Sequence, residues 1–243
     1  MARPTDEQKL EQRIVSRFNK AISKYQLISD GDHILVGLSG GKDSLCLLEL
    51  LANRMKIIRP SFKVTAMHVR MDNIHYETDT AYLEAFADSL EVPLLIATTH
   101  FDETINPRKP ACFLCSWHRR KQMFNIAQKL GCNKIALGHH MDDIIHTAMM
   151  NTFFQGHFST MPVKLGMRKM PLTIIRPLCL EVESDIARFA LLRSYEKQLK
   201  QCPFEKASQR TGMREIFERI ENMNTEARYS VWNALEADGK LVE

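Results

Sequence analysis

Six consecutive residues, Ser39-Gly40-Gly41-Lys42-Asp43-Ser44, combine the groups that bind phosphate. An apolar segment over 34–38 comes before them and another begins at Leu45, which predicts a strand, a tight turn and a helix. The two glycines let backbone amides close on an oxyanion, and the helix N-terminus adds partial positive charge. The Lys42 ammonium and the two serine hydroxyls add further donors. We therefore expect a phosphate group to bind in this turn.

This turn is not the Walker loop, because that motif needs four residues between its first glycine and its Gly-Lys pair. The alternative to phosphate binding is a glycine turn that only caps the helix, with Ser39 and Asp43 as capping residues. The complete six-residue pattern at a strand-to-helix junction favours the phosphate site. The turn resembles the Ser-Gly-Gly-x-Asp-Ser loop of the PP-loop ATP pyrophosphatases. That resemblance implies cleavage of ATP between its α- and β-phosphates, with adenylation of a substrate.

A second group of reactive residues is Cys112-Phe-Leu-Cys115, which two arginines and Lys121 follow. We expect this pair in a loop immediately before a helix over 116–130, where the helix N-terminus and the cations would stabilise thiolates. Such a pair can be half of a zinc site, a redox dithiol or two ligands of an iron–sulfur cluster. The cluster needs a third cysteine, and Cys202 lies in a polar segment where a packing cysteine would be unusual.

The other cysteines, Cys46, Cys132 and Cys179, fall in or beside apolar segments, and we expect them to be small core residues. The first residues of the chain are polar and charged, and no apolar run approaches the length of a membrane span. These features predict a cytoplasmic protein whose six cysteines do not form a disulfide framework.

Two adjacent carboxylates, Asp142 and Asp143, follow a short predicted strand over 134–137 and the residues Gly-His-His-Met. Because parallel strands end at the same edge of a sheet, we expect these carboxylates beside the phosphate turn. One could hold Mg²⁺ or orient an activated substrate, and capping the next helix is the alternative. Asp43 has the same two possibilities, with metal binding favoured by its place in the turn. Lys121 could stabilise an adenylated intermediate, contact an RNA phosphate or lie in solvent.

Apolar strand-like and helical segments alternate along the chain, which predicts βαβ units and an α/β fold. We expect a Rossmann-like parallel sheet of five strands with helices on both faces, preceded by an amphipathic helix over 7–27. Residues 156–170 are expected to form a mobile loop near the site, and one tail helix is expected from about 213 towards 235.

Three regions follow from this pattern. We expect an N-terminal helical segment over 1–30, an ATP-binding domain over 31–195 and a C-terminal extension over 196–243 that carries Cys202. A hydrophobic fraction of 44% and a charged fraction of 26% are ordinary for a globular protein and exclude disorder over most of the chain.

Five motifs occur in the order of the tRNA 2-thiocytidine synthetase (TtcA-like) family, which the chain resembles over residues 10–215. They are Ser39–Ser44, Cys112-x-x-Cys115, Gly138–Asp143, Ile175-Arg176-Pro177-Leu178 and the late Cys202. The resemblance implies a HUP-type Rossmann-like domain, ATP with Mg²⁺, and an oxygen-sensitive 4Fe-4S cluster. It also implies that three cysteines hold this cluster, namely Cys112, Cys115 and Cys202.

The reaction implied by this resemblance is ATP-dependent 2-thiolation of a tRNA base, most simply an anticodon-loop cytidine. The partners implied are tRNA and a sulfide source such as a cysteine desulfurase, without a membrane, and the chain could act as a monomer or a homodimer. One alternative keeps the ATP chemistry but transfers an amine, as lysidine synthetases do, and would not need the cysteines. Another is a non-catalytic protein that binds a nucleotide and zinc.

Basic residues flank the cysteine motif and Cys202. With a formal charge of +4 and a pI of about 8.7, the chain permits an anionic partner. We expect the local basic groups to converge into a positive rim that could follow an RNA backbone. These groups are Arg108-Lys109, Lys164-Arg168-Lys169 and Lys197-Lys200-Lys206-Arg210-Arg214.

Overall fold

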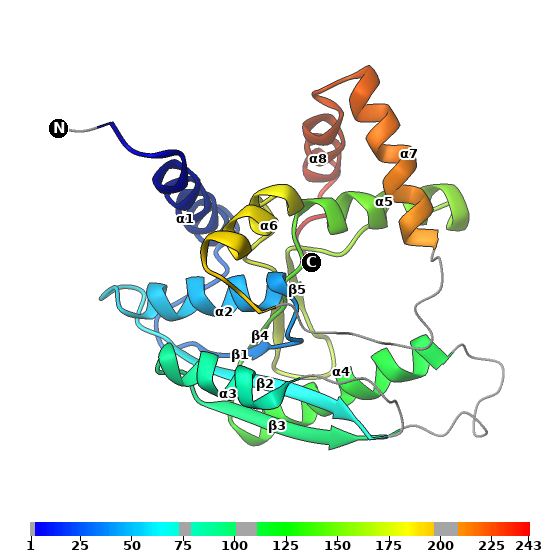
Figure 1. Ribbon diagram of the computed structural model, residues 1–243. Helices are drawn as coiled ribbons and strands as arrows, with labels where there is room; N and C mark the ends of the chain where they lie inside the picture. The colour runs from blue at the N-terminus through cyan, green and yellow to red at the C-terminus, as the bar shows by residue number, and fades with distance from the viewer. Residues whose placement is uncertain (1–2, 73–78, 101–110, 197–208) are drawn as a thin grey trace.

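A single sheet with the strand order β3-β2-β1-β4-β6-β5 runs through the molecule (Figure 1). The computed structural model describes residues 3–72, 79–100, 111–196 and 209–243. The strands are β1 (His33–Gly37), β2 (Lys63–Met71), β3 (Leu94–Thr99), β4 (Lys134–Ala136), β5 (Lys164–Gly166) and β6 (Thr173–Ile175). Neighbouring strands pair in parallel except β5, which pairs antiparallel with β6. The expected α/β fold with a mainly parallel sheet is confirmed.

Within the described residues the sheet has six strands, so the expectation of five was wrong. The additional strand is β5, which lies within the segment over 156–170 that was expected to be a loop. Leu165 of β5 pairs with Ile174, and Lys164 also makes a bridge to Val242 near the C-terminus. A strand of three residues at a sheet edge has no clear alternation of polar and apolar side chains, because its partners rather than its own pattern define it.

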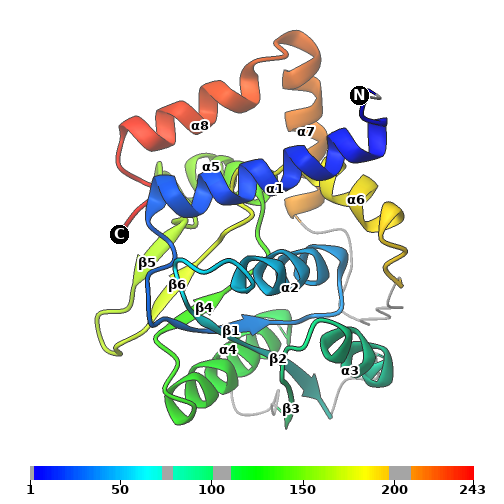
Figure 2. The ribbon, with the colours of Figure 1, turned by 90° about the vertical axis from the view of Figure 1, so that its left-hand side faces the viewer.

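Helices cover both faces of this sheet, as expected. They are α1 (Asp6–Tyr25), α2 (Lys42–Met55), α3 (Thr80–Ser89), α4 (Ala111–Lys129), α5 (Met141–Gln155), α6 (Glu183–Leu192), α7 (Gln209–Met223) and α8 (Ala227–Ala237). Helices α2 and α4 lie on opposite faces of the sheet (Figure 2). Ile34 and Val36 of β1 belong to the core shared with α2, whereas Leu35 belongs to the smaller core under α4. A strand covered on both sides reads as a continuous apolar run, which is why β1 was recognisable.

Helix α1 confirms the amphipathic helix expected near the N-terminus. Thr5 caps its start in a capping box with Gln8, and its apolar face is buried. Its polar face contributes Arg13 and Arg17, which both pair with Asp185 of α6 at 2.7 and 2.9 Å. The amphipathic pattern therefore packs α1 onto the body of the domain.

The C-terminal region contains two helices, α7 and α8, where one tail helix was expected. The two helices are separated by a turn at Asn224, whose side chain accepts a hydrogen bond from the Glu226 amide at 3.0 Å. Asn offers the backbone such a local partner and therefore favours turns over helix interiors. No helix in the described parts of the chain is both long and apolar enough to cross a membrane.

One carboxyl group is buried in the core between α1 and α6. The Glu181 side chain is inaccessible to solvent, and within the described residues its oxygens have no hydrogen-bond partner. The nearest cation is Arg17, at 3.7 Å. Burial raises the pKa of Glu181 to about 8, because the charged form loses its hydration, although Arg17 opposes that shift. The backbone of Glu181 accepts a hydrogen bond from the Met141 amide at 2.9 Å, which fixes the start of α5.

We predict that Glu181→Gln removes a pH dependence of stability. The folded protein holds a proton that the unfolded chain releases near pH 4.5, so this contribution is complete below that pH and is lost as pH rises towards 8. As the pH rises over that interval, the free energy of unfolding of the variant should increase relative to that of the wild type by on the order of a few kcal/mol. Urea unfolding at pH 5, 6, 7 and 8 measures it, with the exposed Glu215→Gln as the control. Parallel curves for wild type and Glu181→Gln would contradict the assignment.

Candidate active site

The phosphate turn lies at the carboxyl edge of the sheet, between β1 and α2. Gly40 has a φ of +80°, a conformation that glycine adopts without strain. Gly41 precedes α2 as its N-cap and provides no side-chain cap, so the first amides of the helix are left for another acceptor. The Ser44 hydroxyl donates to the Gly41 carbonyl at 2.8 Å and accepts from the Ser39 amide at 3.1 Å. These bonds hold the turn in a tight conformation, which is typical of an anion-binding site at a helix N-terminus.

The turn that follows β4 packs directly against the phosphate turn. A Cβ atom on Gly138 would lie 2.9 Å from the carbonyl oxygen of Asp43 and 3.1 Å from the amide nitrogen of Ser44. Both are backbone atoms, which cannot rotate away as a side chain could. Glycine is therefore required at position 138, and the two turns form one rigid unit.

Three carboxylates surround the buried His140 at the start of α5. Its ring nitrogens lie 3.4 Å from Asp142, 3.4 Å from Asp143 and 4.0 Å from Asp43. Burial opposes a charge on the ring, but the carboxylates outweigh burial and raise the pKa of His140. The imidazole thus joins the phosphate turn to the α5 turn.

The two adjacent aspartates differ in their surroundings. Asp142 is buried, pairs with Arg228 of α8 at 2.7 Å and accepts a hydrogen bond from the Glu183 amide at 2.8 Å. Burial opposes its ionisation, but the contacts with His140, the Glu183 amide and Arg228 outweigh that effect and lower the pKa of Asp142 to about 2. Asp143 is half-buried and caps α5 by accepting from the His140 amide at 3.2 Å.

No group of three potential metal ligands occurs among the described residues. Mg²⁺ commonly takes one or two carboxylates and completes its shell with phosphate oxygens and water. Asp43 and Asp143 are each half-buried beside the phosphate turn, so they fit that coordination. Asp142 already has protein partners on both of its oxygens.

A mostly apolar cavity of about 160 Å³ opens beside the phosphate turn. It lies between the ends of the central strands and helix α4. The residues that line it are Gly37, Leu38, Ser39, Met67, His68, Val69, Arg119, Met123 and Leu137. An imidazole nitrogen of the buried His68 lies 2.7 Å from the Leu38 carbonyl, which holds the strand end in place. Such a cavity next to an anion site suits a flat, largely apolar group attached to phosphate.

Helix α4 carries the cysteine pair and one wall of this cavity. Cys112 and Cys115 lie in the first turns of α4, so the expectation that they precede the helix was wrong. Cys112, Cys115, Arg119 and Met123 follow one another at helical spacing and therefore share one face. The last two line the cavity, and Cys115 lies about 6 Å along the helix axis from Arg119.

Lys121 lies on a different face of the same helix. It is exposed, and its ammonium lies 5.1 Å from the centre of the Trp117 ring. The cation that borders the cavity is instead Arg119, which the sequence analysis did not single out. Its position four residues after Cys115 on one helix is the signal that would have identified it. A catalytic role for Lys121 stays a prediction.

The basic groups do not all gather at this edge. Arg168 and Lys169 lie between β5 and β6, at the edge where the parallel strands begin (Figure 2). Arg214 of α7 pairs with Glu183 at 3.0 Å. The remaining basic residues before Cys112 and around Cys202 fall outside the described residues, as does Cys202 itself, apart from the backbone of Arg210 in α7.

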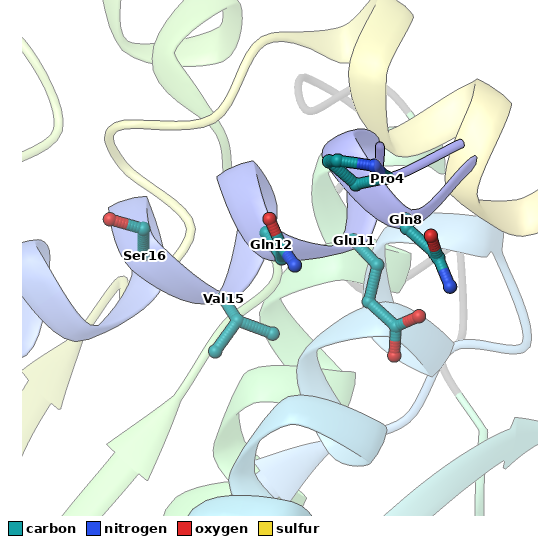
Figure 3. A pocket seen from close by; sticks show the side chains of 6 residues that line it. All are labelled: Pro4, Gln8, Glu11, Gln12, Val15 and Ser16. Atoms are coloured by element: carbon teal, nitrogen blue, oxygen red, sulfur yellow. The ribbon is translucent and has the colours of Figure 1, made fainter. Parts of the chain in front are cut away.

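A larger hollow of about 550 Å³ runs along the outer face of α1 (Figure 3). Its lining residues are Pro4, Gln8, Glu11, Gln12, Val15 and Ser16. Glu11 is the only charged side chain among them, and all come from the N-terminal segment. The hollow therefore lacks the cations and glycines that make the phosphate turn a site.

A model of the PP-loop domain family matches residues 10–198. The chain belongs to the PP-loop domain family. The matched region includes the phosphate turn over 39–44, which we call the PP loop below, and the cavity beside it. Buried Cys46, Cys132 and Cys179 are confirmed as core residues.

Two similar proteins are both named tRNA-cytidine(32) 2-sulfurtransferase. The protein of Shewanella loihica is 38% identical over 191 residues, which are 77% of this chain and 60% of that protein. The protein of Shewanella denitrificans is 40% identical over 191 residues, 77% of this chain and 58% of that protein. The chain thus spans about 60% of the length of these relatives.

A solved structure shares the fold. The U34-tRNA thiolase NcsA from Methanococcus maripaludis, determined with its [4Fe-4S] cluster, superposes with a TM-score of 0.79 at 22% identity. The match covers 95% of this chain and 79% of NcsA. At this identity the likeness supports the arrangement of the sheet and helices.

We predict that Gly138→Ala disrupts the PP loop. The new methyl group would displace the backbone at Asp43, so affinity for a magnesium–ATP analogue should fall at least about tenfold, a cost of roughly 1.4 kcal/mol or more. Isothermal titration calorimetry measures the affinity. Gly212→Ala is the matched control, because a Cβ there meets no atom within 4 Å. Equal affinities for Gly138→Ala and wild type would show that the close packing is not needed for binding.

Proposed function

We propose that this chain is an ATP-dependent tRNA thiolation enzyme that adenylates a base and then replaces its oxygen with sulfur. The observation that carries the proposal is the shared face of α4, on which Cys112 and Cys115 lead to Arg119 at the cavity beside the PP loop. A site for ATP phosphates and a pair of thiols are thus held by neighbouring elements. The names of the relatives support tRNA cytidine as the substrate.

The PP loop supplies the groups for the nucleotide. The uncapped amides of α2 and the Lys42 ammonium would bind the phosphates, and the apolar cavity would receive the adenine ring. Asp43 and Asp143 would hold Mg²⁺ together with phosphate oxygens. Burial opposes a charge on Lys42, but Asp43 and Glu183 outweigh burial and raise its pKa, so Lys42 is cationic at neutral pH.

The cysteine pair fits two ligands of a 4Fe-4S cluster. The two thiols lie one helical turn apart, Cys112 is exposed and Cys115 is half-buried, and neither forms a disulfide. Cys202 is the proposed third ligand. When bound, such a cluster would supply an iron that is free of protein ligands and can carry sulfide.

The reaction divides into two displacements. The 2-oxo oxygen of the cytosine attacks the α-phosphorus of ATP, and pyrophosphate leaves. Sulfide then attacks the C2 carbon and AMP leaves, which takes the original oxygen with it. Adenylation is needed because a carbonyl oxygen is a poor leaving group. Arg119 lies where a cation could stabilise the charge that develops on the transferred phosphate.

The partners belong to the same proposal. The base must be unstacked from the anticodon loop to reach the α-phosphorus of a nucleotide bound at the PP loop. Sulfide would come from a donor such as a cysteine desulfurase, and the chain would work in the cytoplasm, where thiols stay reduced. Lys121 and the basic residues that flank the cysteines are proposed contacts for the tRNA backbone, and a homodimer stays a prediction.

Two other functions make different demands on the cysteines. Amine transfer at the same PP loop would use ATP in the same way but would leave Cys112 and Cys115 without a role. A non-catalytic nucleotide-binding protein could use them for zinc, although within the described residues they are not joined by two further ligands.

We predict that Cys112→Ser and Cys115→Ser abolish thiolation and leave nucleotide affinity unchanged. The substitutions remove cluster ligands, and both residues lie outside the lining of the cavity. Anaerobically reconstituted protein would be assayed for iron, for labile sulfide and, by nucleoside mass spectrometry, for 2-thiocytidine in tRNA. Cys132→Ser makes the same chemical change at a buried cysteine and should retain iron and activity. Wild-type levels of 2-thiocytidine from the Cys112 and Cys115 variants would overturn their role as cluster ligands. ATP turnover that is unchanged in these variants, with no 2-thiocytidine formed even by the wild type, would overturn thiolation and favour amine transfer.

A further inference from the structure

An ion-pair chain connects the PP loop to the C-terminal helices. The Lys42 ammonium lies 3.2 Å from Asp43 and 3.3 Å from one carboxylate oxygen of Glu183. The other oxygen of Glu183 lies 3.0 Å from the Arg214 guanidinium on α7. Glu183 therefore has two cationic partners, one that is part of the PP loop and one outside the region that matches the PP-loop family.

The backbone holds Glu183 in this bridging position. Glu183 is the first residue of α6, and its amide donates to Asp142 at 2.8 Å. The other oxygen of Asp142 pairs with Arg228 of α8 at 2.7 Å. Asp142, Glu183, Arg214 and Arg228 all line a polar cavity of about 180 Å³ between α5, α6, α7 and α8. Glu183 is thus fixed at a cavity that residues of four helices line.

Nucleotide phosphate and Glu183 compete for the same cation. Both are anions that need the Lys42 ammonium, and Lys42 is about one-third exposed, so its pair with Glu183 is partly screened by solvent. An incoming phosphate can therefore draw Lys42 away from Glu183 at a modest cost. Glu183 is not left without a partner when this happens, because Arg214 remains in contact with it.

We propose that Glu183 is a positioning residue that links phosphate binding at the PP loop to the attachment of α7. This rests on the proposed function only in requiring that the PP loop bind nucleotide phosphates. Phosphate binding releases Lys42 from Glu183. The Glu183 carboxylate then pairs with Arg214 and no longer with Lys42, which strengthens the contact between α6 and α7. By linkage, Arg214 must favour phosphate binding to the same degree, since it weakens the hold of Glu183 on Lys42.

Opposite signs for the two substitutions test this. Glu183→Gln should bind magnesium–AMPPNP about two- to fivefold more tightly, because it frees Lys42 and removes a negative charge. Arg214→Gln should bind it about two- to fivefold more weakly, because Lys42 becomes the main partner of Glu183. The double variant should match Glu183→Gln. Exposed residues of α7 give controls of the same charge change, Glu215→Gln and Arg219→Gln, and should leave the affinity unchanged.

Hydrogen exchange of α7 supplies a second readout that a merely structural role would not move. Amides over 211–223 should exchange more slowly when AMPPNP binds the wild type, and this protection should be absent in Glu183→Gln. Affinity changes of the same sign for Glu183→Gln and Arg214→Gln, or unchanged exchange in the wild type, would overturn the proposal.

Failure of the proposed function is distinguishable from failure of this inference. If the wild type binds no nucleotide, the proposed function fails. Whether Lys42 and Arg214 compete for the Glu183 carboxylate can then be tested on protein without ligand. A double-mutant cycle of Lys42→Met and Arg214→Gln in urea unfolding should then be non-additive, because each cation competes for one carboxylate. Additive free energies of unfolding would overturn the inference as well.

Discussion

The backbone contact between two turns, at Gly138 and Asp43, fixes the geometry of the carboxyl edge of the sheet. A side chain at position 138 would collide with backbone atoms, so the turn after β4 and the PP loop after β1 have one possible spacing. This spacing determines the position of the start of α2 with its free amides. It also determines the position of the start of α5 with His140 and the surrounding carboxylates. The anion site and the carboxylates that would hold its counter-ion are thereby set by strand pairing, because β1 and β4 are adjacent in the sheet.

Ion pairs also hold this edge of the sheet to the C-terminal helices. The first turn of α6 brings Glu183 to Lys42, and the Glu183 amide donates a hydrogen bond to Asp142. Helices α7 and α8 contribute Arg214 and Arg228 as partners of these two carboxylates. The C-terminal helices thus neutralise acidic groups that border the PP loop, although they lie beyond the matched family region. The Asp142–Arg228 pair is largely buried, because its side chains are 9% and 18% exposed, whereas Arg214 is 53% exposed and its pair with Glu183 is more strongly screened by solvent.

The sequence predicted the elements whose patterns are strong. The PP loop, the buried strand β1, the amphipathic α1 and the core positions of Cys46 and Cys132 were all recognisable, because each depends on local periodicity or on a complete motif. The short strand β5 and the break between α7 and α8 were missed, since pairing with β6 and a local Asn224 hydrogen bond define them. Arg119 was missed for a related reason: its importance lies in facing the cavity, and only the three-dimensional course of α4 shows that.

The placement of the two chemistries on separate elements has a mechanistic consequence. The PP loop belongs to the start of α2 and the thiols to the start of α4, which pack on opposite faces of the sheet. Both helices begin at the carboxyl edge, because each follows a parallel strand whose end lies there. In the proposed reaction, a base bound at that edge would therefore meet the adenylyl group on the PP-loop side and sulfide on the α4 side. In the proposed reaction sulfide would add to the face of the activated C2 carbon before AMP leaves, so the base need not move between two sites.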